Sequence, residues 1–263
     1  MPQLRSGSVQ PQTARRNPRL PLVPADCGAE PRVTVGEHGL ILDLDGTLVD
    51  SYRPIAESLN HARAHYRLEP LDLSTVRAEV GHGLEQLIGR WIGADRIEDG
   101  VRLFRERYEQ VFQSATEPLP GVDAALRRLA RTGYRLALAS NKPARFSRVI
   151  LRHFGWESLF SAVEGPDTVG SAKPDPAMLL ACLAALGTPV DRTRYIGDMP
   201  LDEISGGRAR LAVILVRGGS ASETELRNAG PPVLTGFAAL PDFLSDLGWP
   251  VRSAPAPEDR DLP

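Results

Sequence analysis

Two aspartates, Asp43 and Asp45, directly follow the apolar residues 40–42 in the segment GLILDLDGTLVDS, residues 39–51. The apolar run is typical of a short buried strand, and carboxylates at its end are costly to desolvate unless something pairs with them. One carboxylate can attack phosphorus as a nucleophile, while the other protonates the leaving alcohol and later deprotonates the hydrolytic water. Gly46 would let the backbone turn closely around the phosphate.

Further polar groups follow later apolar runs. In a doubly wound parallel sheet, ligands bind beyond the carboxyl ends of the strands, so polar residues there are candidates for chemistry. Carboxylates, a hydroxyl and one ammonium group suit a phosphate ester held with Mg²⁺, which prefers oxygen ligands. Asp43 and Asp198 are the carboxylates that we expect to bind this ion. The other polar candidates at the same edge are Asp45, Ser140, Asn141, Lys173 and Asp202.

Lysine is rare in this chain. Of 31 basic residues only two are lysines, Lys142 and Lys173, and both lie in candidate motifs. Lysine is a compact point charge whereas arginine is a planar fork, so a site that needs the former resists replacement. We therefore expect Lys173 to bind the charge on the phosphoryl oxygens. For Lys142, an exposed charge and a helper near the phosphate are both left open.

The elements that must position these residues alternate along the chain. Apolar strand patterns alternate with amphipathic helix patterns from residue 118 onward, with strands expected at residues 134–140, 162–164, 194–198 and 211–216. This alternation predicts an α/β fold with a doubly wound, Rossmann-like parallel sheet. Between the first strand and residue 118, apolar residues recur at a spacing of three to four, which predicts helices only.

The domain organisation follows from this order. We predict an α/β core made of residues 37–51 and 118–250, with an inserted helical cap at residues 52–117. The core is interrupted by the cap because the helical block lies between the first strand and the next helix of the sheet.

The ends of the chain are rich in proline and polar residues. We expect residues 1–36 and 251–263 to be disordered tails, because they have too few apolar groups to form a core. No methionine follows the first one before Met178, which leaves a start at Val33 or Val35 open.

Composition limits the partners. The chain has 263 residues and a formal net charge of −2, so no global field favours nucleic acid or an anionic membrane. No apolar run approaches the ~20 residues of a spanning helix. The two cysteines, Cys27 and Cys182, lack the spacing of a metal site or disulfide framework, which fits a reduced, cytoplasmic location. We expect a small phosphate ester as partner, with monomer and homodimer both open.

At the candidate residues the sequence resembles a known family. The segments DLDGTLVDS, the hydroxyl after LALA, AKPDP and GDxxxD resemble, in order, the four motifs of haloacid dehalogenase superfamily phosphatases, within residues 39–219. The helical insertion resembles the small C1 cap of that superfamily. VGHGLEQLIGRWIG and EPLPGVDAALRRLARTGYRLALASNKP most resemble phosphoglycolate phosphatases. One departure is Met199, since many relatives carry a hydroxyl residue directly after the metal aspartate.

The resemblance implies roles for the carboxylates. Asp43 would be nucleophile and metal ligand. Asp45 would act as acid and base and would bind Mg²⁺ through its backbone carbonyl. Asp198 would complete the protein ligands of Mg²⁺, the implied cofactor.

The resemblance also implies roles for the remaining candidates. Ser140 and Lys173 would hold the phosphate, and Asp202 would support the outer shell of the metal. From the residues alone, a serine after a strand also suits a turn, and an acid in a first helical turn also suits the helix dipole. The candidate substrate-binding residues are Gly46, Thr47 and Asn141 near the phosphate and His82 and Arg90 in the cap.

Several functions compete. A calcium-binding EF-hand loop is disfavoured because Thr47 and Pro54 stand where acids are required. The acid at Asp45 favours phosphoryl transfer over dehalogenation, and the cap lacks the lysine that a phosphonoacetaldehyde hydrolase needs. We expect a Mg²⁺-dependent phosphomonoester hydrolase acting through an aspartyl-phosphate on a 2-phosphoglycolate-like substrate. A β-phosphoglucomutase-like transferase, a pyrophosphatase and a non-catalytic binding module remain as alternatives.

Overall fold

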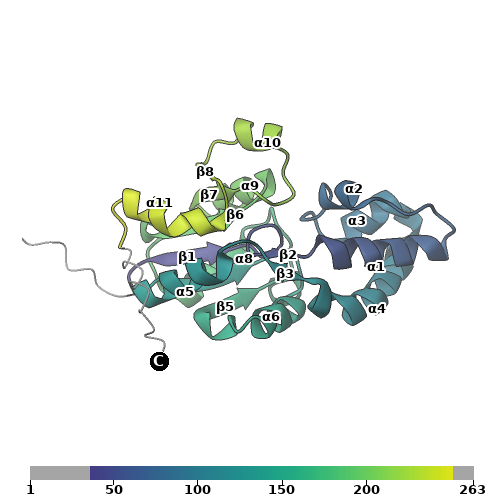
Figure 1. Ribbon diagram of the computed structural model, residues 1–263, viewed down its shortest axis with the longest axis horizontal. Helices are drawn as coiled ribbons and strands as arrows, with labels where there is room; N and C mark the ends of the chain where they lie inside the picture. Colours follow the sequence, from purple (N-terminus) through teal and green to yellow (C-terminus); the bar gives the residue numbers. More distant parts are fainter. Residues whose placement is uncertain (1–35, 251–263) are drawn as a thin grey trace, which may run out of the picture. The chain divides into compact units, whose positions relative to one another are not determined.

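A six-stranded parallel sheet forms the centre of the computed structural model, which describes residues 36–250 (Figure 1). The strand order is β5-β4-β1-β6-β7-β8. The strands are β1 Gly39–Leu42, β4 Arg135–Ala139, β5 Phe160–Glu164, β6 Thr193–Gly197, β7 Ala212–Val216 and β8 Val233–Leu234. The predicted tails lie outside the described residues, apart from Gly36.

Helices cover both faces of the sheet because its strands are apolar on both sides. Leu40 and Leu42 of β1 join a core cluster with the helices α5, α6 and α11, whereas Ile41 joins a second cluster with α8. This alternation is that of a strand buried between two layers. It confirms the predicted doubly wound α/β fold. The helices of these layers are α5 Val122–Thr132, α6 Ala144–His153, α8 Ala177–Leu186, α9 Pro200–Arg208 and α11 Leu240–Asp246.

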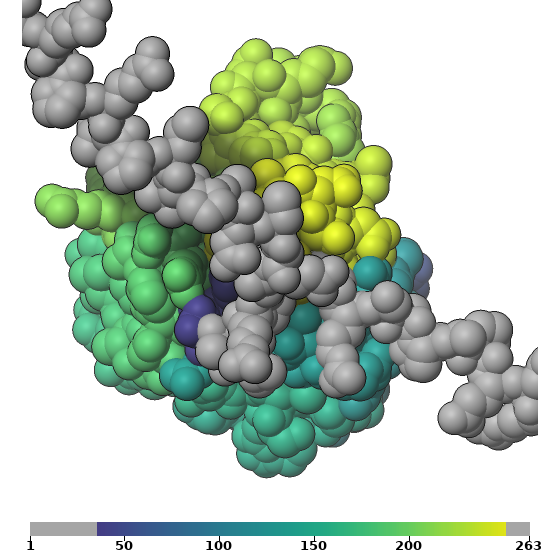
Figure 2. Space-filling view, turned by 90° about the vertical axis from the view of Figure 1, so that its left-hand side faces the viewer, coloured from purple at the N-terminus to yellow at the C-terminus, as the bar shows by residue number. Residues whose placement is uncertain are grey.

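The sequence did not predict the short elements of the core. They include β8, α11, α7 Pro166–Val169 and α10 Glu223–Asn228, with the 3₁₀ turns η2 Glu157–Leu159, η3 Val190–Arg192 and η4 Phe237–Ala239. Elements this short cover fewer than two helical periods, which is too little for a hydrophobic period to be recognised. Figure 2 looks from the side where α11, in yellow, lies at the surface, and the cap helices are almost entirely hidden behind the core.

Four helices fill the segment between the first strand and α5. They are α1 Tyr52–His65, α2 Leu73–Arg77, α3 Leu84–Trp91 and α4 Ile97–Ala115, with a 3₁₀ turn η1 Ala94–Arg96 (Figure 1). Among residues 36–250, no helix is both long and apolar enough to cross a membrane. We refer to α1–α4 as the cap, and its limits as a separate domain stay a prediction.

The second cap helix, α2, is offset from the apolar pattern TVRAEV at residues 75–80, which is typical of a helix. It begins at Leu73 because the Asp72 side chain accepts a hydrogen bond from the Thr75 amide at 2.7 Å and caps the helix. It ends at Arg77, and the Gly81 carbonyl beyond it accepts a hydrogen bond from the core residue Asn141 at 2.8 Å.

The two connections between core and cap pair with each other. β2 Val49–Asp50 and β3 Glu117–Pro118 form a short antiparallel ladder. The Leu119 amide extends it by donating to the Leu48 carbonyl at 3.0 Å. The chain therefore enters and leaves the cap at one place.

Strand register sets the level of the polar residues. Leu42 of β1 lies opposite Leu138 of β4 and Ile196 of β6. The Asp43 amide donates to the Ile196 carbonyl at 2.9 Å. The residues that follow these three strands therefore meet at one edge of the sheet.

Candidate active site

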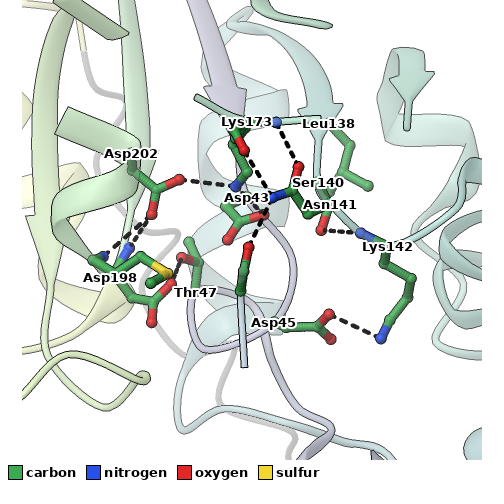
Figure 3. Close-up of polar contacts among 12 residues, drawn as sticks. Asp43, Asp45, Thr47, Leu138, Ser140, Asn141, Lys142, Lys173, Asp198 and Asp202 are labelled. Atoms are coloured by element: carbon green, nitrogen blue, oxygen red, sulfur yellow. Dashed lines mark hydrogen bonds and ion pairs between the residues drawn. The ribbon is translucent and has the colours of Figure 1, made fainter. Parts of the chain in front are cut away.

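Three carboxylates gather at this edge. Asp43 follows β1, Asp198 follows β6, and Asp202 lies in the first turn of α9 (Figure 3). One carboxylate oxygen of each lies within 4.8 Å of the others, and all three residues are buried. Ligand atoms this close, all of them oxygen, are suited to a hard divalent cation.

Asp202 is held by four hydrogen bonds. Its Oδ2 accepts the backbone N–H groups of Asp198 at 3.1 Å and Met199 at 3.2 Å. Its Oδ1 accepts from the Lys173 ammonium at 2.8 Å and from the Tyr195 hydroxyl at 2.6 Å. Both oxygens are therefore occupied by protein donors, which leaves Asp43 and Asp198 better placed to ligate an ion.

Lys173 supplies the cation nearest to these acids. Its Nζ lies 3.0 Å from Asp43 Oδ1 and 2.8 Å from Asp202 Oδ1, and the residue is only 4% exposed. Burial lowers the pKa of this ammonium, but the carboxylates of Asp202 and Asp43 outweigh burial and hold the pKa above its ordinary value. Lys173 is therefore charged at neutral pH.

One ammonium does not balance three buried acids. The pKa of Asp43 is raised to about 6, because burial and repulsion from Asp202 and Asp45 together outweigh the attraction of Lys173. Burial also raises the pKa of Asp198 well above its ordinary value, with further contributions from Asp202 and Asp43. Excess negative charge in a buried site favours a bound cation.

The loops around Asp198 approach its carboxylate closely. Its Oδ2 accepts the Ser220 backbone N–H at 2.6 Å, and its Oδ1 lies 3.5 Å from the Thr47 hydroxyl. A Cβ on Gly46, where φ is +82°, or on Gly219 would collide with this carboxylate. Glycine is therefore required at both positions by space, and at Gly46 by backbone conformation as well. Thr47 faces the Asp198 carboxylate in this arrangement.

Asp45 forms an ion pair with a second lysine, Lys142. Its carboxylate lies 2.8 Å from Lys142 Nζ and also accepts a hydrogen bond from the Ser51 hydroxyl. The Lys142 ammonium lies 5.1 Å from the centre of the Tyr108 ring. Lys142 is 8% exposed, so it is not an exposed charge. The scarcity of lysine was the sequence signal that pointed to it.

Ser140 and Asn141 follow β4, and their side chains have different hydrogen-bond partners. Ser140 Oγ accepts the Lys142 amide at 3.3 Å. The Asn141 side chain donates to the Gly81 carbonyl of the cap at 2.8 Å and accepts the Lys173 amide at 2.7 Å. Asn141 therefore links a cap loop to the backbone of the buried lysine.

A cavity of about 90 Å³ lies between the core and the cap. Its core wall includes Asp43, Asp45, Ser140, Asn141, Lys142 and Lys173. Its cap wall includes Glu79, Leu84, Leu87, Phe104, Arg105 and Tyr108. The structure thus brings most of the predicted core residues to one cavity, although their roles stay predictions.

The two predicted cap residues lie elsewhere. His82 and Arg90 are both exposed and are not among the lining residues, and Arg90 Nε lies 3.0 Å from Glu79 Oε1. Their substrate-binding role stays a prediction without support from this geometry. The lining residues Arg105 and Tyr108 were missed, because an amphipathic helix pattern does not tell which boundary residues face a cavity.

Comparison with known proteins agrees with this arrangement. A family model described as "Haloacid dehalogenase-like hydrolase" matches residues 40–216. The phosphoglycolate phosphatase of Cereibacter sphaeroides is 39% identical over 218 residues, 80% of this chain and 98% of that protein. The phosphoglycolate phosphatase of Psychrobacter arcticus is 32% identical over 217 residues, 78% of this chain and 94% of that protein.

Solved structures share the fold. A predicted phosphoglycolate phosphatase from Haemophilus somnus superposes with a TM-score of 0.73 at 26% identity, over 79% of this chain and 98% of the other. A predicted phosphatase from Clostridium acetobutylicum gives a TM-score of 0.72 at 24% identity, over 80% of this chain and 99% of the other. The second likeness concerns the fold alone.

Proposed function

The chain belongs to the haloacid dehalogenase-like hydrolase family and is a phosphatase, and we propose that it hydrolyses small phosphate monoesters through an aspartyl-phosphate on Asp43. One observation carries this proposal. Asp43 lies at the cavity wall with Lys173 at 3.0 Å, and Asp45 lines the same cavity two residues further on. A nucleophile, a phosphate-binding cation and an acid therefore face one space.

The proposed reaction has two steps. In the first, an Asp43 oxygen bonds to phosphorus while the ester P–O bond breaks, and Asp45 gives its proton to the leaving alcohol. In the second, Asp45 takes a proton from water as the water oxygen bonds to phosphorus and the bond between phosphorus and the Asp43 oxygen breaks, which releases phosphate and restores the Asp43 carboxylate. Lys173 and Ser140 would bind the charge that spreads over the phosphoryl oxygens.

We further propose Mg²⁺ as the cofactor. Asp43 and Asp198 would hold it through their side chains and Asp45 through its backbone carbonyl, while Asp202 fixes the Asp198 backbone. The ion would reduce repulsion between the attacking carboxylate and the phosphoryl oxygens. The fit rests on the three close carboxylates and on the raised pKa of Asp43 and Asp198.

The proposed substrate is 2-phosphoglycolate or a similar small ester. Two relatives that are phosphoglycolate phosphatases are matched over 94% and 98% of their length. The cavity of about 90 Å³ holds a leaving group of a few non-hydrogen atoms, since one water needs about 10–15 Å³ of such space.

A substrate panel with a nucleophile variant tests the proposal. Purified protein with Mg²⁺ should release phosphate from 2-phosphoglycolate, and Asp43→Asn should lower kcat by at least about a thousandfold while keeping the fold, because the amide cannot attack phosphorus. Circular dichroism serves as the folding control. Turnover by the variant at the wild-type rate would refute the nucleophile. Phosphate transfer to a sugar phosphate, or release from pyrophosphate alone, would favour the alternative activities.

A further inference from the structure

Arg105 on α4 is a cation on the cap wall of the cavity with an unused donor. Its Nε is buried and has no hydrogen-bond partner in the described part of the chain. The Arg105 and Glu85 side chains are 42% and 64% exposed, and Glu85 Oε1 lies 3.8 Å from Arg105 Nη2. This distance is too long for a hydrogen bond.

The surroundings of Arg105 raise the free-energy cost of leaving its Nε donor without an acceptor. The rest of the cap wall is mostly apolar, with Ile55, Leu84, Leu87 and Phe104. It also includes Tyr108 and the acid Glu79, which is paired with Arg90 at 3.0 Å. A buried donor without a partner costs about 1–3 kcal/mol, and more when it is charged. An acceptor brought by a ligand would remove that cost.

The other basic groups of the cavity are already paired. Lys142 is bound to Asp45, and Lys173 is shared by Asp43 and Asp202. Among the lining cations of the described residues, Arg105 therefore has the weakest pairing, a 3.8 Å contact with exposed Glu85, and an Nε donor that can bind an anion from the leaving-group side.

We propose that Arg105 binds a carboxylate on the alcohol part of the substrate and so selects phosphate esters of small hydroxy acids. This inference rests on the proposed phosphatase function and adds the residue that recognises the leaving alcohol. A guanidinium matches a carboxylate with two parallel hydrogen bonds, and both are stronger in an apolar, partly closed cavity.

Binding of non-hydrolysable probes tests the proposal without turnover. 3-Phosphonopropionate carries a carboxylate where propylphosphonate carries a methyl group, and both replace the ester oxygen by a methylene. Wild-type protein with Mg²⁺ should bind the first probe more tightly in calorimetric titrations. Arg105→Met keeps an unbranched apolar side chain and should reduce this preference by about 10- to 100-fold. Arg105→Lys should keep part of it.

Arg102→Met is the matched control on the same helix. Arg102 is exposed and binds Asp99 and Glu106 instead of lining this cavity, so its loss should leave the preference as in wild type. Equal preference in wild type and Arg105→Met, or weaker binding of both probes by the same factor, would overturn the inference. Absence of phosphate release from 2-phosphoglycolate by wild type would instead count against the proposed function, because the probe titration does not depend on turnover.

Discussion

At the scale of single residues, the buried acids are held together by the lysines. Lys173 bridges Asp43 and Asp202, and Lys142 balances Asp45 (Figure 3). Breaking a buried ion pair by removing one partner leaves an uncompensated charge, which is more damaging than the loss of an exposed pair. We therefore expect Lys173 to contribute more to the free energy of unfolding than Lys142, because Lys173 pairs with two carboxylates and Lys142 with one.

Lys173→Met tests this difference. We expect it to lower the free energy of unfolding by about 3–5 kcal/mol, because Asp43 and Asp202 lose their shared cation, and to reduce hydrolysis of every phosphate ester alike. Urea unfolding measures the first effect. Lys142→Met is the matched control and should lose less stability. A Lys173→Met protein as stable as wild type would contradict the expected charge balance.

The raised pKa of Asp43 predicts a pH dependence in the metal-free protein. Its folded-state value of about 6 lies above the ordinary value of 3.8, so the folded protein holds this proton more tightly than the unfolded chain. The stabilising contribution is therefore present near pH 4 and is lost as the pH rises to 6. In chelator, the Tm of Asp43→Asn relative to wild type should increase over this window and then level off. A constant difference from pH 4 to 7 would argue against the shift.

At the scale of elements, the segment after β7 links the cap to the Asp198 carboxylate. Arg77 at the end of α2 donates to the Gly219 carbonyl at 3.1 Å and also to the Gly218 carbonyl. The next residue, Ser220, donates its backbone N–H to Asp198 at 2.6 Å. A loop of the core thus contacts a cap helix on one side and a proposed metal ligand on the other.

Gly219→Ala should weaken metal binding. The added Cβ would collide with the Asp198 carboxylate, so the carboxylate or the loop must shift. Disturbing groups that support a ligand commonly lowers metal affinity by about 10- to 100-fold. Calorimetric titration with Mg²⁺ measures this. Gly207→Ala on α9, where a Cβ meets no atom within 4 Å, is the control and should leave the affinity unchanged. Equal affinities in the two variants would contradict the close packing around Asp198.

The sequence predicted the core elements better than the cap wall. Asp43 and Asp198 were placed correctly at one sheet edge, because alternating strands and helices fix which strand ends meet. Arg105 gave no such signal, since its helix is polar along its exposed side and the pattern does not show where that side borders a cavity. The helix α11 was missed for another reason, because its seven residues cover less than two full helical periods.

At the scale of the whole molecule, folding and metal binding should be linked. Three acids that repel one another in the folded chain separate on unfolding, so a cation that binds only the folded state stabilises it. If Mg²⁺ is the proposed ion, apparent stability should therefore depend on the free Mg²⁺ concentration.

A thermal titration checks this linkage. Mg²⁺ at about 100 times its Kd should add about 2.7 kcal/mol to the free energy of unfolding of wild type. Asp198→Asn should lose most of this gain, because a neutral amide is a poorer ligand, while being less destabilised by chelator. Differential scanning calorimetry measures both proteins. A Tm that does not respond to Mg²⁺ in wild type would refute the linkage.

The scarcity of lysine has a practical consequence for labelling. The only two lysines of the chain, Lys142 and Lys173, are 8% and 4% exposed and are paired with carboxylates. Amine-acylating reagents attack the neutral amine, and both ammonium groups have a pKa above the ordinary value, although burial alone would lower it. The folded protein should therefore resist side-chain acylation almost completely. Acylation of these lysines, read by mass spectrometry, would then report each opening of the site to solvent.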